Sequence, residues 1–412
     1  EQSMKNLIIG QSGGPTAAIN SSLAGAIYEA LKSSEIDKVY GMEHGIAGML
    51  RGDITDLTGY FSQKKNIERL KLTPSAFLGS CRYKLPNDYS DECYDKIFEL
   101  CQKNDIAYFL YIGGNDSMDT IMKLSHVGKE RNSDICFVGV PKTIDNDLPE
   151  IDHTPGYGSA AKFVATSVME TAHDASVYDV KSVTIIEIMG RNAGWLVGAS
   201  ALAKRANNGF APHLIYFPEI PFSKDKFISD VKEQLKSVKN VIVAISEGIK
   251  DENGNLVCDV FGDDTVDCFG HKALSGSGKV LENIIKQELG CKVRSVEINT
   301  LQRSAAHLLS KTDIDEAFAI GQKAAELALG GQSGKMVSVR RLSSVPYAVE
   351  LTAADIEKIA NTENCVPREF INADGTGVTD LFMEYVTPLV QGEIYPNYEN
   401  GVPKYISIRD LK

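Results

Sequence analysis

The chain has 412 residues and a formal net charge of −12, from 43 Lys and Arg against 55 Asp and Glu. This acidic balance excludes a general binder of nucleic acid or of acidic membranes, although it leaves room for a local basic pocket. Hydrophobic residues make up 43% and charged residues 24%, an ordinary globular mixture that excludes a disordered or coiled-coil chain. The length predicts two or three domains.

Neither a membrane span nor a secretion signal is visible in the sequence. No apolar run approaches the roughly 18 residues of a span, and only a short apolar run precedes the first glycines. The cysteines are scattered without C-x-x-C spacing, and the histidines show no spacing typical of metal ligands. We therefore expect a cytoplasmic protein with reduced thiols and no zinc site.

Short apolar runs typical of strands alternate with helical patterns along most of the chain. The run NVIVAI at 240–245 is continuous and rich in β-branched residues, which is typical of a strand buried on both faces of a parallel sheet. Repeated βαβ units of this kind predict a doubly wound α/β fold. Residues 251–270 are expected to form a polar loop, and those after 337 to be less regular. Strands are expected at 6–9, 105–112, 135–140, 183–188 and 240–245, with helices at 17–31, from 114 to about 129, at 159–173 and after 190.

Each expected strand ends in a glycine-rich or polar turn, and ligands of open parallel sheets bind beyond the carboxyl ends of the strands. Glycine loops there let backbone N–H groups approach an anion closely. The sequence SGSGK at 275–279 has Val280 where a Walker loop needs Ser or Thr, and no strand precedes it, so we expect a helix N-terminal loop. The turns are GQSGGPT at 10–16, GGNDS at 113–117, PKTIDND at 141–147, MGR at 189–191 and SEG at 246–248.

The PKTIDND turn carries the most specific chemistry. Asp145 and Asp147 are separated by one residue, so one carboxylate can act as a base while the other holds a divalent cation. Lys142 supplies positive charge for a phosphate. A polar turn with an aspartate cap is the alternative for these residues taken alone, and the other polar strand exits argue against it.

These motifs, with FLGSCR at 77–82 and Gln302-Arg303, occur in an order and at spacings that resemble the phosphofructokinase family over most of the chain. The chain looks most like the pyrophosphate-dependent branch, because ATP-dependent members usually have glycine at the positions of Asp116 and Lys142. A carboxylate at Asp116 would repel the α-phosphate of a nucleotide, whereas Lys142 would attract the compact pyrophosphate anion.

The resemblance implies a phosphofructokinase fold of two similar Rossmann-like α/β domains, each three layers thick with a mainly parallel sheet. Residues 1–155 plus 302–347 would bind the phosphoryl donor, and residues 156–301 plus 348–412 would bind the sugar phosphate. The implied activity is a glycolytic one: reversible, Mg²⁺-dependent phosphoryl transfer from pyrophosphate to the C1 hydroxyl of fructose 6-phosphate. Active sites shared between subunits would require a homodimer or homotetramer.

The resemblance also assigns roles to individual residues. Asp145 would take the proton of the C1 hydroxyl of fructose 6-phosphate, with Lys142 and Thr143 as further catalytic groups. Mg²⁺ would be held by Asp147 and by Asn115, which stands where many members have an aspartate. The pyrophosphate pocket would be lined by Gly13, Arg82, Gly114, Asp116 and Lys142. The sugar phosphate would be bound by Met189, Gly190, Arg191, Glu247 and Arg303, with Arg294 reaching in from a neighbouring subunit.

Two alternatives remain open at this point. One is an ATP-dependent 6-phosphofructokinase with the same fold. The other is a non-catalytic regulatory subunit that binds a sugar phosphate; Asp145, Asp147 and Arg191 argue against it, because such a subunit needs no base beside a cation site. The first expected helix lacks the arginines of the bacterial effector site, so regulation by nucleotides or phosphoenolpyruvate is not expected.

Overall fold

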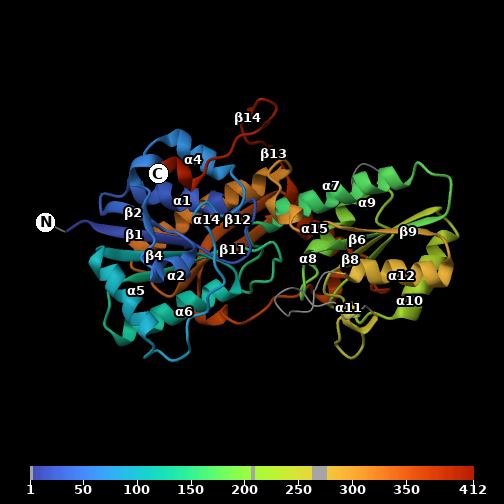
Figure 1. The fold of residues 1–412 in the computed structure, drawn as a ribbon, viewed down its shortest axis with the longest axis horizontal. Helices are drawn as coiled ribbons and strands as arrows, with labels where there is room; N and C mark the ends of the chain where they lie inside the picture. Colours follow the sequence, from blue (N-terminus) through green and yellow to red (C-terminus); the bar gives the residue numbers. More distant parts are fainter. Residues whose placement is uncertain (1–2, 206–208, 262–275) are drawn as a thin grey trace.

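The computed structural model describes residues 3–205, 209–261 and 276–412. Two lobes lie side by side, and each is built around one sheet (Figure 1). The blue N-terminal segments share the lobe of the larger sheet with orange and red segments from the C-terminal part of the chain. The chain therefore crosses between the lobes more than once.

The larger sheet has seven strands in the order β12-β11-β5-β4-β1-β2-β3. The central strands run parallel, and the edge strands β12 and β3 are antiparallel to their neighbours. Leu7, Ile8 and Ile9 of β1 are all fully buried, because helices cover both faces of a central strand. The strands are β1 (Lys5–Gln11), β2 (Ile36–Met42), β3 (Ile54–Asp56), β4 (Ile106–Gly113), β5 (Cys136–Pro141), β11 (Lys335–Ser344) and β12 (Tyr347–Asp355).

Helices α1 and α14 lie on one face of this sheet, and α5 and α6 on the other (Figure 1). The first two approach each other closely, since a Cβ on Gly25 would collide with the carbonyl oxygen of Phe318, and one on Gly321 with that of Ser22. Glycine at both contacts is therefore required for this packing. The helices of the lobe are α1 (Ile19–Lys32), α2 (Gly45–Leu50), α3 (Thr58–Phe61), α4 (Lys64–Lys71), α5 (Glu92–Lys103), α6 (Asn115–Glu130) and α14 (Lys311–Leu329).

The smaller sheet has four parallel strands in the order β7-β8-β6-β9. Alternate residues of β6 face opposite sides, as the pleat dictates. Ile186 and Ile188 pack in a core with α7 and α8, whereas Val183 and Ile185 pack in a second core with α10 and α12. The elements are β6 (Ser182–Ile188), β7 (Leu214–Tyr216), β8 (Asn240–Ser246), β9 (Lys292–Glu297), α7 (Tyr157–Ala175), α8 (Trp195–Ala199), α9 (Ala201–Arg205), α10 (Lys224–Leu235), α11 (Val257–Phe261) and α12 (Ser277–Leu289).

Shorter elements complete the described chain. They are α13 (Leu301–Ser304), β10 (Leu309–Ser310), η1 (Ile356–Lys358), η2 (Arg368–Phe370), α15 (Asp380–Val386), η3 (Thr387–Val390), β13 (Glu393–Ile394), β14 (Tyr398–Glu399), β15 (Val402–Pro403) and η4 (Ile408–Leu411). No helix in the described ranges is both long and apolar enough to cross a membrane.

The α/β class and all five expected strands are confirmed. The expectation of irregular structure after residue 337 is wrong for β11 and β12, which form a long antiparallel pair. Met336, Val337 and Val339 are buried where β11 joins β5, although the charged residues around them mask the strand pattern. Within the expected loop 251–270, the structure describes the short helix α11, and residues 262–270 lie outside the described residues.

Residues 348–412 contribute to both lobes. Strand β12 belongs to the larger sheet, and Ile406 packs in the larger core, although the expected division grouped residues 348–412 with the sugar-phosphate unit. Val366, Phe382 and Leu389 pack in the core of the smaller lobe. The other boundaries of the two functional units stay a prediction.

The Walker-like sequence does begin a helix, as expected, and a carboxylate of the chain itself occupies the helix N-terminus. The N–H groups of Gly276 and Ser277 donate to one oxygen of Glu187, over 3.3 and 3.2 Å. Burial, and then the charge of Glu297, raise the pKa of Glu187 to about 7. The backbone N–H groups that would hold a phosphate are thus already bound to the protein. Ser275 lies outside the described residues.

Candidate active site

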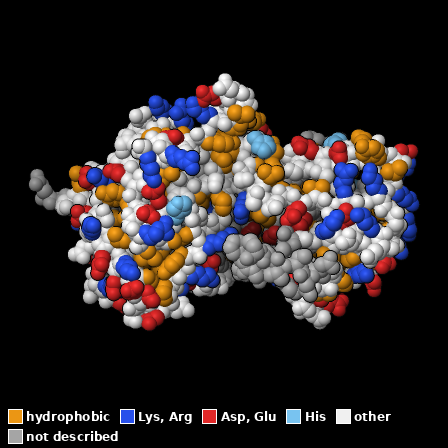
Figure 2. Space-filling view, in the orientation of Figure 1, with side chains coloured by type: hydrophobic (Ala, Val, Ile, Leu, Met, Phe, Trp, Pro, Cys, Tyr) orange, Lys and Arg blue, Asp and Glu red, His pale blue; other side chains and the backbone are white. Residues whose placement is uncertain are grey.

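A cavity of about 490 Å³ opens where the two lobes meet. Figure 2 shows acidic and basic side chains close together at the waist between the lobes. The turns after β1, β4 and β5 line it from one side, and the turns after β6 and β8 from the other. Its lining includes Gly13, Arg82, Gly114, Asn115, Asp116, Lys142, Thr143, Asp145, Asp147, Met189, Arg191, Glu247 and Arg303.

The turn after β1 forms a glycine loop at one end of the cavity. Gly13 has φ +75°, in the left-handed region that glycine adopts without strain. Its N–H donates to the carbonyl oxygen of Cys81 over 3.1 Å, and Ser80 Oγ donates to the Gly13 carbonyl over 2.6 Å. These bonds hold the segment that carries Arg82 beside the loop.

Lys142 reaches under this loop from the end of β5. Its Nζ donates to the carbonyl oxygen of Gly14 over 2.5 Å, and only 2% of the residue is exposed. Burial lowers the pKa of Lys142 to about 7, against the opposite effect of Asp145, and Arg82 and Arg303 lower it further. An anion bound beside the amine would favour its charged form.

Asp145 and Asp147 are both largely buried carboxyls in the cavity wall. Burial, and then the charge of Glu247, raise the pKa of Asp145 to about 6. Burial, and then the charge of Asp145, raise the pKa of Asp147 to about 7, and Glu363 contributes in both cases. The Asp145 N–H donates to Thr143 Oγ1 over 3.1 Å, which leaves the threonine proton for another acceptor. Carboxyls of this kind are typical of proton acceptors and of cation sites.

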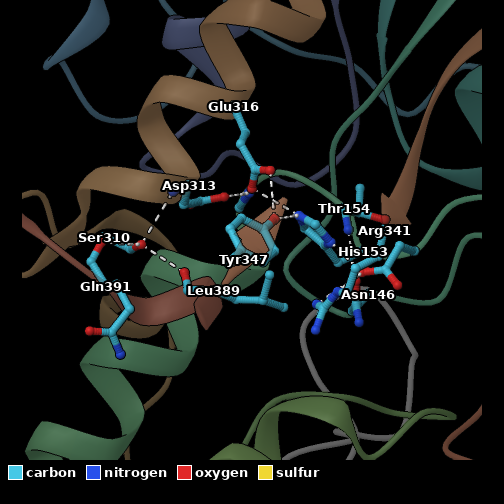
Figure 3. A network of polar contacts seen from close by, with 12 residues as sticks. Asn146, His153, Thr154, Ser310, Asp313, Glu316, Arg341, Tyr347, Leu389 and Gln391 are labelled. Atoms are coloured by element: carbon cyan, nitrogen blue, oxygen red, sulfur yellow. Dashed lines mark hydrogen bonds and ion pairs between the residues drawn. The ribbon is translucent and has the colours of Figure 1, made fainter. Parts of the chain in front are cut away.

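The turn between the two aspartates is held from behind (Figure 3). Asn146, at φ +56°, accepts the N–H of Thr154 over 2.8 Å and donates its side-chain N–H to the Tyr385 hydroxyl over 2.7 Å. The Tyr385 hydroxyl donates in turn to the Asp152 carbonyl over 2.8 Å. Asparagine tolerates the left-handed region better than most residues. These bonds therefore fix the backbone between the aspartates on either side of Asn146.

A buried ionic cluster anchors the same loop to α14 and to β11 and β12 (Figure 3). His153 bonds to Asp152 over 2.7 Å and to Glu316 over 2.9 Å, and Tyr347 donates to Glu316 over 2.7 Å. Arg341 pairs with Asp152 over 2.9 Å. Burial alone would lower the pKa of His153, but hydrogen bonds to Asp152 and Glu316 raise it to about 9. His153 is therefore charged at neutral pH.

We expect the contribution of His153 to stability to be present near pH 6 and to disappear as the pH rises through 9. Its folded pKa, about 9, lies above the unfolded value of about 6.5, so protonation favours the folded state until the pH exceeds the folded value. The shift in the pKa of His153 corresponds to a contribution of about 3 kcal/mol to the free energy of unfolding. The measurement compares the Tm of wild type and His153→Gln near both ends of this range. An equal difference in Tm at the two ends would contradict a charged His153.

The turns after β6 and β8 pack tightly against each other on the opposite wall. The Gly190 N–H donates to Glu247 Oε1 over 3.3 Å, and Ser246 Oγ donates to the Gly190 carbonyl over 2.5 Å. A Cβ on Gly248 would collide with the carbonyl oxygen of Arg191, so this turn requires glycine. Burial raises the pKa of Glu247. The turns present Arg191 and Glu247 to the cavity, and Gly190 supports them from behind.

Arg303 enters the cavity from the short helix α13. Beside it, Gln302 accepts the N–H of Met189 over 3.0 Å, which ties α13 to the turn after β6. A Cβ on Gly14 would lie 3.3 Å from a guanidinium nitrogen of Arg303, so the arginine reaches the glycine loop of the other wall. The role of Arg303 in binding the 6-phosphate stays a prediction.

Known proteins share this architecture. A sequence profile described as Phosphofructokinase matches residues 6–328. The chain belongs to the phosphofructokinase family. It is 41% identical to pyrophosphate–fructose 6-phosphate 1-phosphotransferase of Halomonas elongata over 97% of this chain and 95% of that protein.

Solved structures of the family confirm the expected fold. The crystal structure of pyrophosphate-dependent phosphofructokinase from Nitrosospira multiformis matches with a TM-score of 0.88, at 38% identity, over 98% of this chain and 96% of that one. The corresponding structure from Marinobacter aquaeolei matches with a TM-score of 0.87, at 36% identity, over 98% and 95% of the two chains.

Two residues at the start of α6 have partners that the family pattern did not indicate. Asp116 lies at the rim of the cavity, with 72% of its side chain exposed, and pairs with Lys84 over 3.4 Å. The amide oxygen of Asn115 accepts the N–H of Asn361 over 2.6 Å, and its amide nitrogen donates to the carbonyl of Thr362. Both polar atoms of Asn115 are thus bound to backbone from the C-terminal part of the chain.

Arg294 lies outside the cavity of its own chain. It is on β9, about half-exposed, and pairs with Asp174 over 3.5 Å. Its expected reach into the site of a neighbouring subunit stays a prediction.

Sequence reasoning missed Lys84 and Glu363, which both line the cavity. Lys84 follows the FLGSCR motif by two residues, so its closeness to Arg82 in the chain is the signal that could have indicated it. Glu363 lies 35 residues beyond the end of the family match and has no recognisable motif around it. Only the folded structure brings it to the site.

Proposed function

We propose that this chain transfers a phosphoryl group reversibly from pyrophosphate to the C1 hydroxyl of fructose 6-phosphate, giving fructose 1,6-bisphosphate and orthophosphate. The observation that carries the proposal is the position of Lys142. Its buried amine lies under the glycine loop, in the same cavity as Asp145 and Asp147. A compact, highly charged donor supplies the anion that such a buried amine needs. The printed names of the relatives agree with this donor and acceptor.

The positions of the side chains support the following roles in the reaction. Asp145 takes the proton of the C1 hydroxyl as that oxygen attacks one phosphorus atom of pyrophosphate; the bond from this phosphorus to the bridging oxygen breaks, and orthophosphate leaves. Thr143 donates its free hydroxyl proton to the transferring phosphoryl group, while Lys142 and Arg82 neutralise charge on the pyrophosphate. Catalysis consists mainly of positioning and charge neutralisation for an in-line transfer, with one general base.

The sugar phosphate occupies the opposite wall in this proposal. Met189, Arg191 and Glu247 hold the sugar, and Arg303 binds the 6-phosphate. Gly190, which was expected to bind the sugar as well, does not line the cavity and is bound to Glu247 and Ser246 behind it. Glu247 is a partly buried carboxyl group that can accept hydrogen bonds from sugar hydroxyls. Arg191 and Arg303 line the same cavity and supply positive charge for the phosphate.

Mg²⁺ fits the donor side of the cavity. The negative charge of Asp145 raises the pKa of Asp147, and a divalent cation bound there would offset this repulsion. Among the described residues, no cluster of three or more His, Cys, Asp or Glu side chains could hold a metal by itself. That suits Mg²⁺, which keeps waters and binds through one or two carboxylates and substrate phosphates. Asp147 would hold it, and when bound it would neutralise phosphate charge. Asn115, the second ligand expected from the sequence, already has both polar atoms bound.

The test is a coupled assay of purified protein with fructose 6-phosphate and either pyrophosphate or ATP, followed by the reverse reaction with orthophosphate. We expect turnover with pyrophosphate, Mg²⁺ dependence and a measurable reverse rate. Pyrophosphatase added to the ATP reaction serves as the control, because ATP preparations contain pyrophosphate. Turnover with ATP alone would replace this proposal by the ATP-dependent alternative. Binding of fructose 6-phosphate without turnover with either donor would favour a regulatory subunit.

We also propose a cytoplasmic homo-oligomer in which Arg294 completes the site of a neighbouring subunit. Asp145→Asn and Arg294→Ala should each be inactive alone, and mixed subunits should recover activity, because one site of each hybrid dimer contains neither change. Random mixing of equal amounts into dimers restores about a quarter of the sites. Hybrids detected by mass spectrometry that stay inactive would show that each chain carries a complete site.

A further inference from the structure

Six residues from the C-terminal part of the chain, 361–366, are hydrogen-bonded to both walls of the cavity, and we call them the closing segment. They follow η1 and precede η2, and they lie beyond the residues matched by the family profile. Glu363 in their middle lines the cavity. The closing segment therefore belongs to the site by position, although no role in the proposed reaction has been given to it.

The closing segment is fastened to the donor wall at the start of α6. Asn115 contacts it twice, through the N–H of Asn361 and the carbonyl of Thr362. The side-chain N–H of Asn361 also donates to Asp119 over 3.1 Å, one turn further along α6. All three bonds come from one helix end, next to Gly114, which follows β4 and precedes α6.

It is fastened to the sugar wall as well. Asn192, which follows the MGR turn, donates to Glu363 Oε1 over 3.1 Å. Trp195 Nε1 donates to the carbonyl of Asn364 over 2.9 Å. Val366, which is buried, donates its N–H to Glu219 over 2.9 Å. The side chains of this wall therefore hold the segment at three successive points.

Between these two attachments the segment touches the catalytic turn itself. The N–H of Asn364 donates to the carbonyl oxygen of Asp147 over 2.7 Å. A shift of the segment would move the backbone that carries Asp147 and, two residues away, Asp145. Misplacement of reacting groups by about 1 Å can cost roughly 100-fold in rate.

The partners of Asn115 account for the residue type at this position. An N–H group and a carbonyl oxygen face the two ends of its side chain, so one end must accept and the other must donate. Asparagine meets both requirements. Aspartate, the residue at this position in many family members, can only accept when ionised, and its second oxygen would face the carbonyl of Thr362.

We propose that the closing segment is a positioning element that fixes the two walls and the Asp145–Asp147 turn relative to each other, with Asn115 as its fastening residue rather than a metal ligand. The proposal rests on the proposed function for its effect on rate, but not for the attachment of the segment. Asn115 could be a metal ligand or the residue that fastens the closing segment, and the two roles differ in what replacement by aspartate would do. If Asn115 is a metal ligand, aspartate should keep or lower the Mg²⁺ concentration needed for half-maximal rate. If it fastens the segment, aspartate should release the segment, because the N–H donor to the Thr362 carbonyl is lost.

Asn115→Asp and Asn115→Ala test the proposal with a readout that needs no activity. Cys365 is an exposed thiol of the closing segment whose Sγ contacts the Asn192 carbonyl over 3.6 Å. Burial raises the pKa of Cys365, so release of the segment should increase its thiolate fraction and its access. Labelling with iodoacetamide is followed at the peptide that contains Cys365, because other cysteines also react. Asn132→Asp, an exposed site just beyond the other end of α6, is the matched control.

We expect both Asn115 variants to label Cys365 about 5- to 100-fold faster than wild type, the range given by losing one or two partly exposed hydrogen bonds. Their kcat should fall at least about tenfold, with a half-maximal Mg²⁺ concentration no lower than that of wild type, because release of the segment would disturb the backbone of Asp147, and the control should behave as wild type. Wild-type labelling in Asn115→Asp would overturn the proposal, as would a lower half-maximal Mg²⁺ concentration with full kcat. Far-UV circular dichroism and Tm show whether α6 is intact. A wild-type chain without phosphotransferase activity would refute the proposed function and leave the labelling result valid.

Discussion

Replacing Asp145 by asparagine is expected to lower kcat by about 10²- to 10⁴-fold, the range that a general base contributes. Asparagine keeps the size of the side chain and one hydrogen-bond acceptor, but it cannot take a proton from the C1 hydroxyl. The carboxyl group lies in the cavity wall beside Thr143 and Lys142, where the reacting oxygen and the donor would meet. The measurement is kcat with saturating pyrophosphate and fructose 6-phosphate.

Binding and metal dependence separate the roles of the two aspartates. Asp145→Asn should bind fructose 6-phosphate with nearly wild-type affinity and need the same Mg²⁺ concentration for its residual activity. The companion variant Asp147→Asn should need much more Mg²⁺, because it has lost the charge that would hold the cation. Near wild-type kcat in Asp145→Asn would remove this residue from the proton transfer.

The sequence alone indicated the residues of the cavity wall that lie in one stretch of chain. Asp145, Asp147, Lys142 and Thr143 share the exit of β5, and a parallel sheet gathers its strand exits at one edge. The MGR turn follows β6 of the second sheet, and only the resemblance to the family indicated a second domain facing the first across the site. The residues of the β5 exit lie together in the cavity because they are close in the chain, while their roles stay a prediction.

The remaining parts depend on contacts between distant segments. Glu363 reaches the cavity only because the chain returns from β12 across both walls, and nothing near it in the sequence marks that path. Strand β11 was missed because Arg340 and Arg341 interrupt its apolar alternation near the sheet edge, where side chains stay partly solvated. The sequence did single out Asn115 as a departure from the family pattern, but its partners, Asn361 and Thr362, lie about 246 residues away.

The choice of phosphoryl donor is expected to depend on Asp116 and Lys142 together, with Lys142 having the larger effect. Asp116 lies at the rim with most of its side chain in solvent and beside Lys84, so water and that ammonium group screen its charge. Lys142 is buried under the glycine loop, where an unscreened charge is worth more. Asp116→Gly alone should therefore raise kcat/KM for ATP by about tenfold and lower that for pyrophosphate only moderately.

Lys142→Gly should lower kcat/KM for pyrophosphate by at least about 100-fold, because the donor loses a desolvated cation. Lys142→Met is the matched control for the cavity that glycine leaves, since methionine keeps a long apolar side chain without the charge. If the charge of Lys142 matters, kcat/KM for pyrophosphate falls in both variants. If only the packing of its side chain matters, kcat/KM falls in Lys142→Gly alone. Asp116→Asn is the corresponding control at the rim, because asparagine removes the charge of Asp116 and keeps the size of its side chain.

The double variant Asp116→Gly with Lys142→Gly should invert the ratio of kcat/KM for pyrophosphate to that for ATP. The ratio is the decisive quantity, because a poorly shaped adenine pocket lowers the ATP rate in every variant and cancels in the comparison between them. All four proteins are measured with both donors at one fixed Mg²⁺ concentration. A ratio that Asp116→Gly leaves unchanged would reduce Asp116 to a surface partner of Lys84. Discrimination against nucleotides would then have to come from the shape of the donor wall, since Lys142 attracts either anion and cannot by itself exclude the larger one.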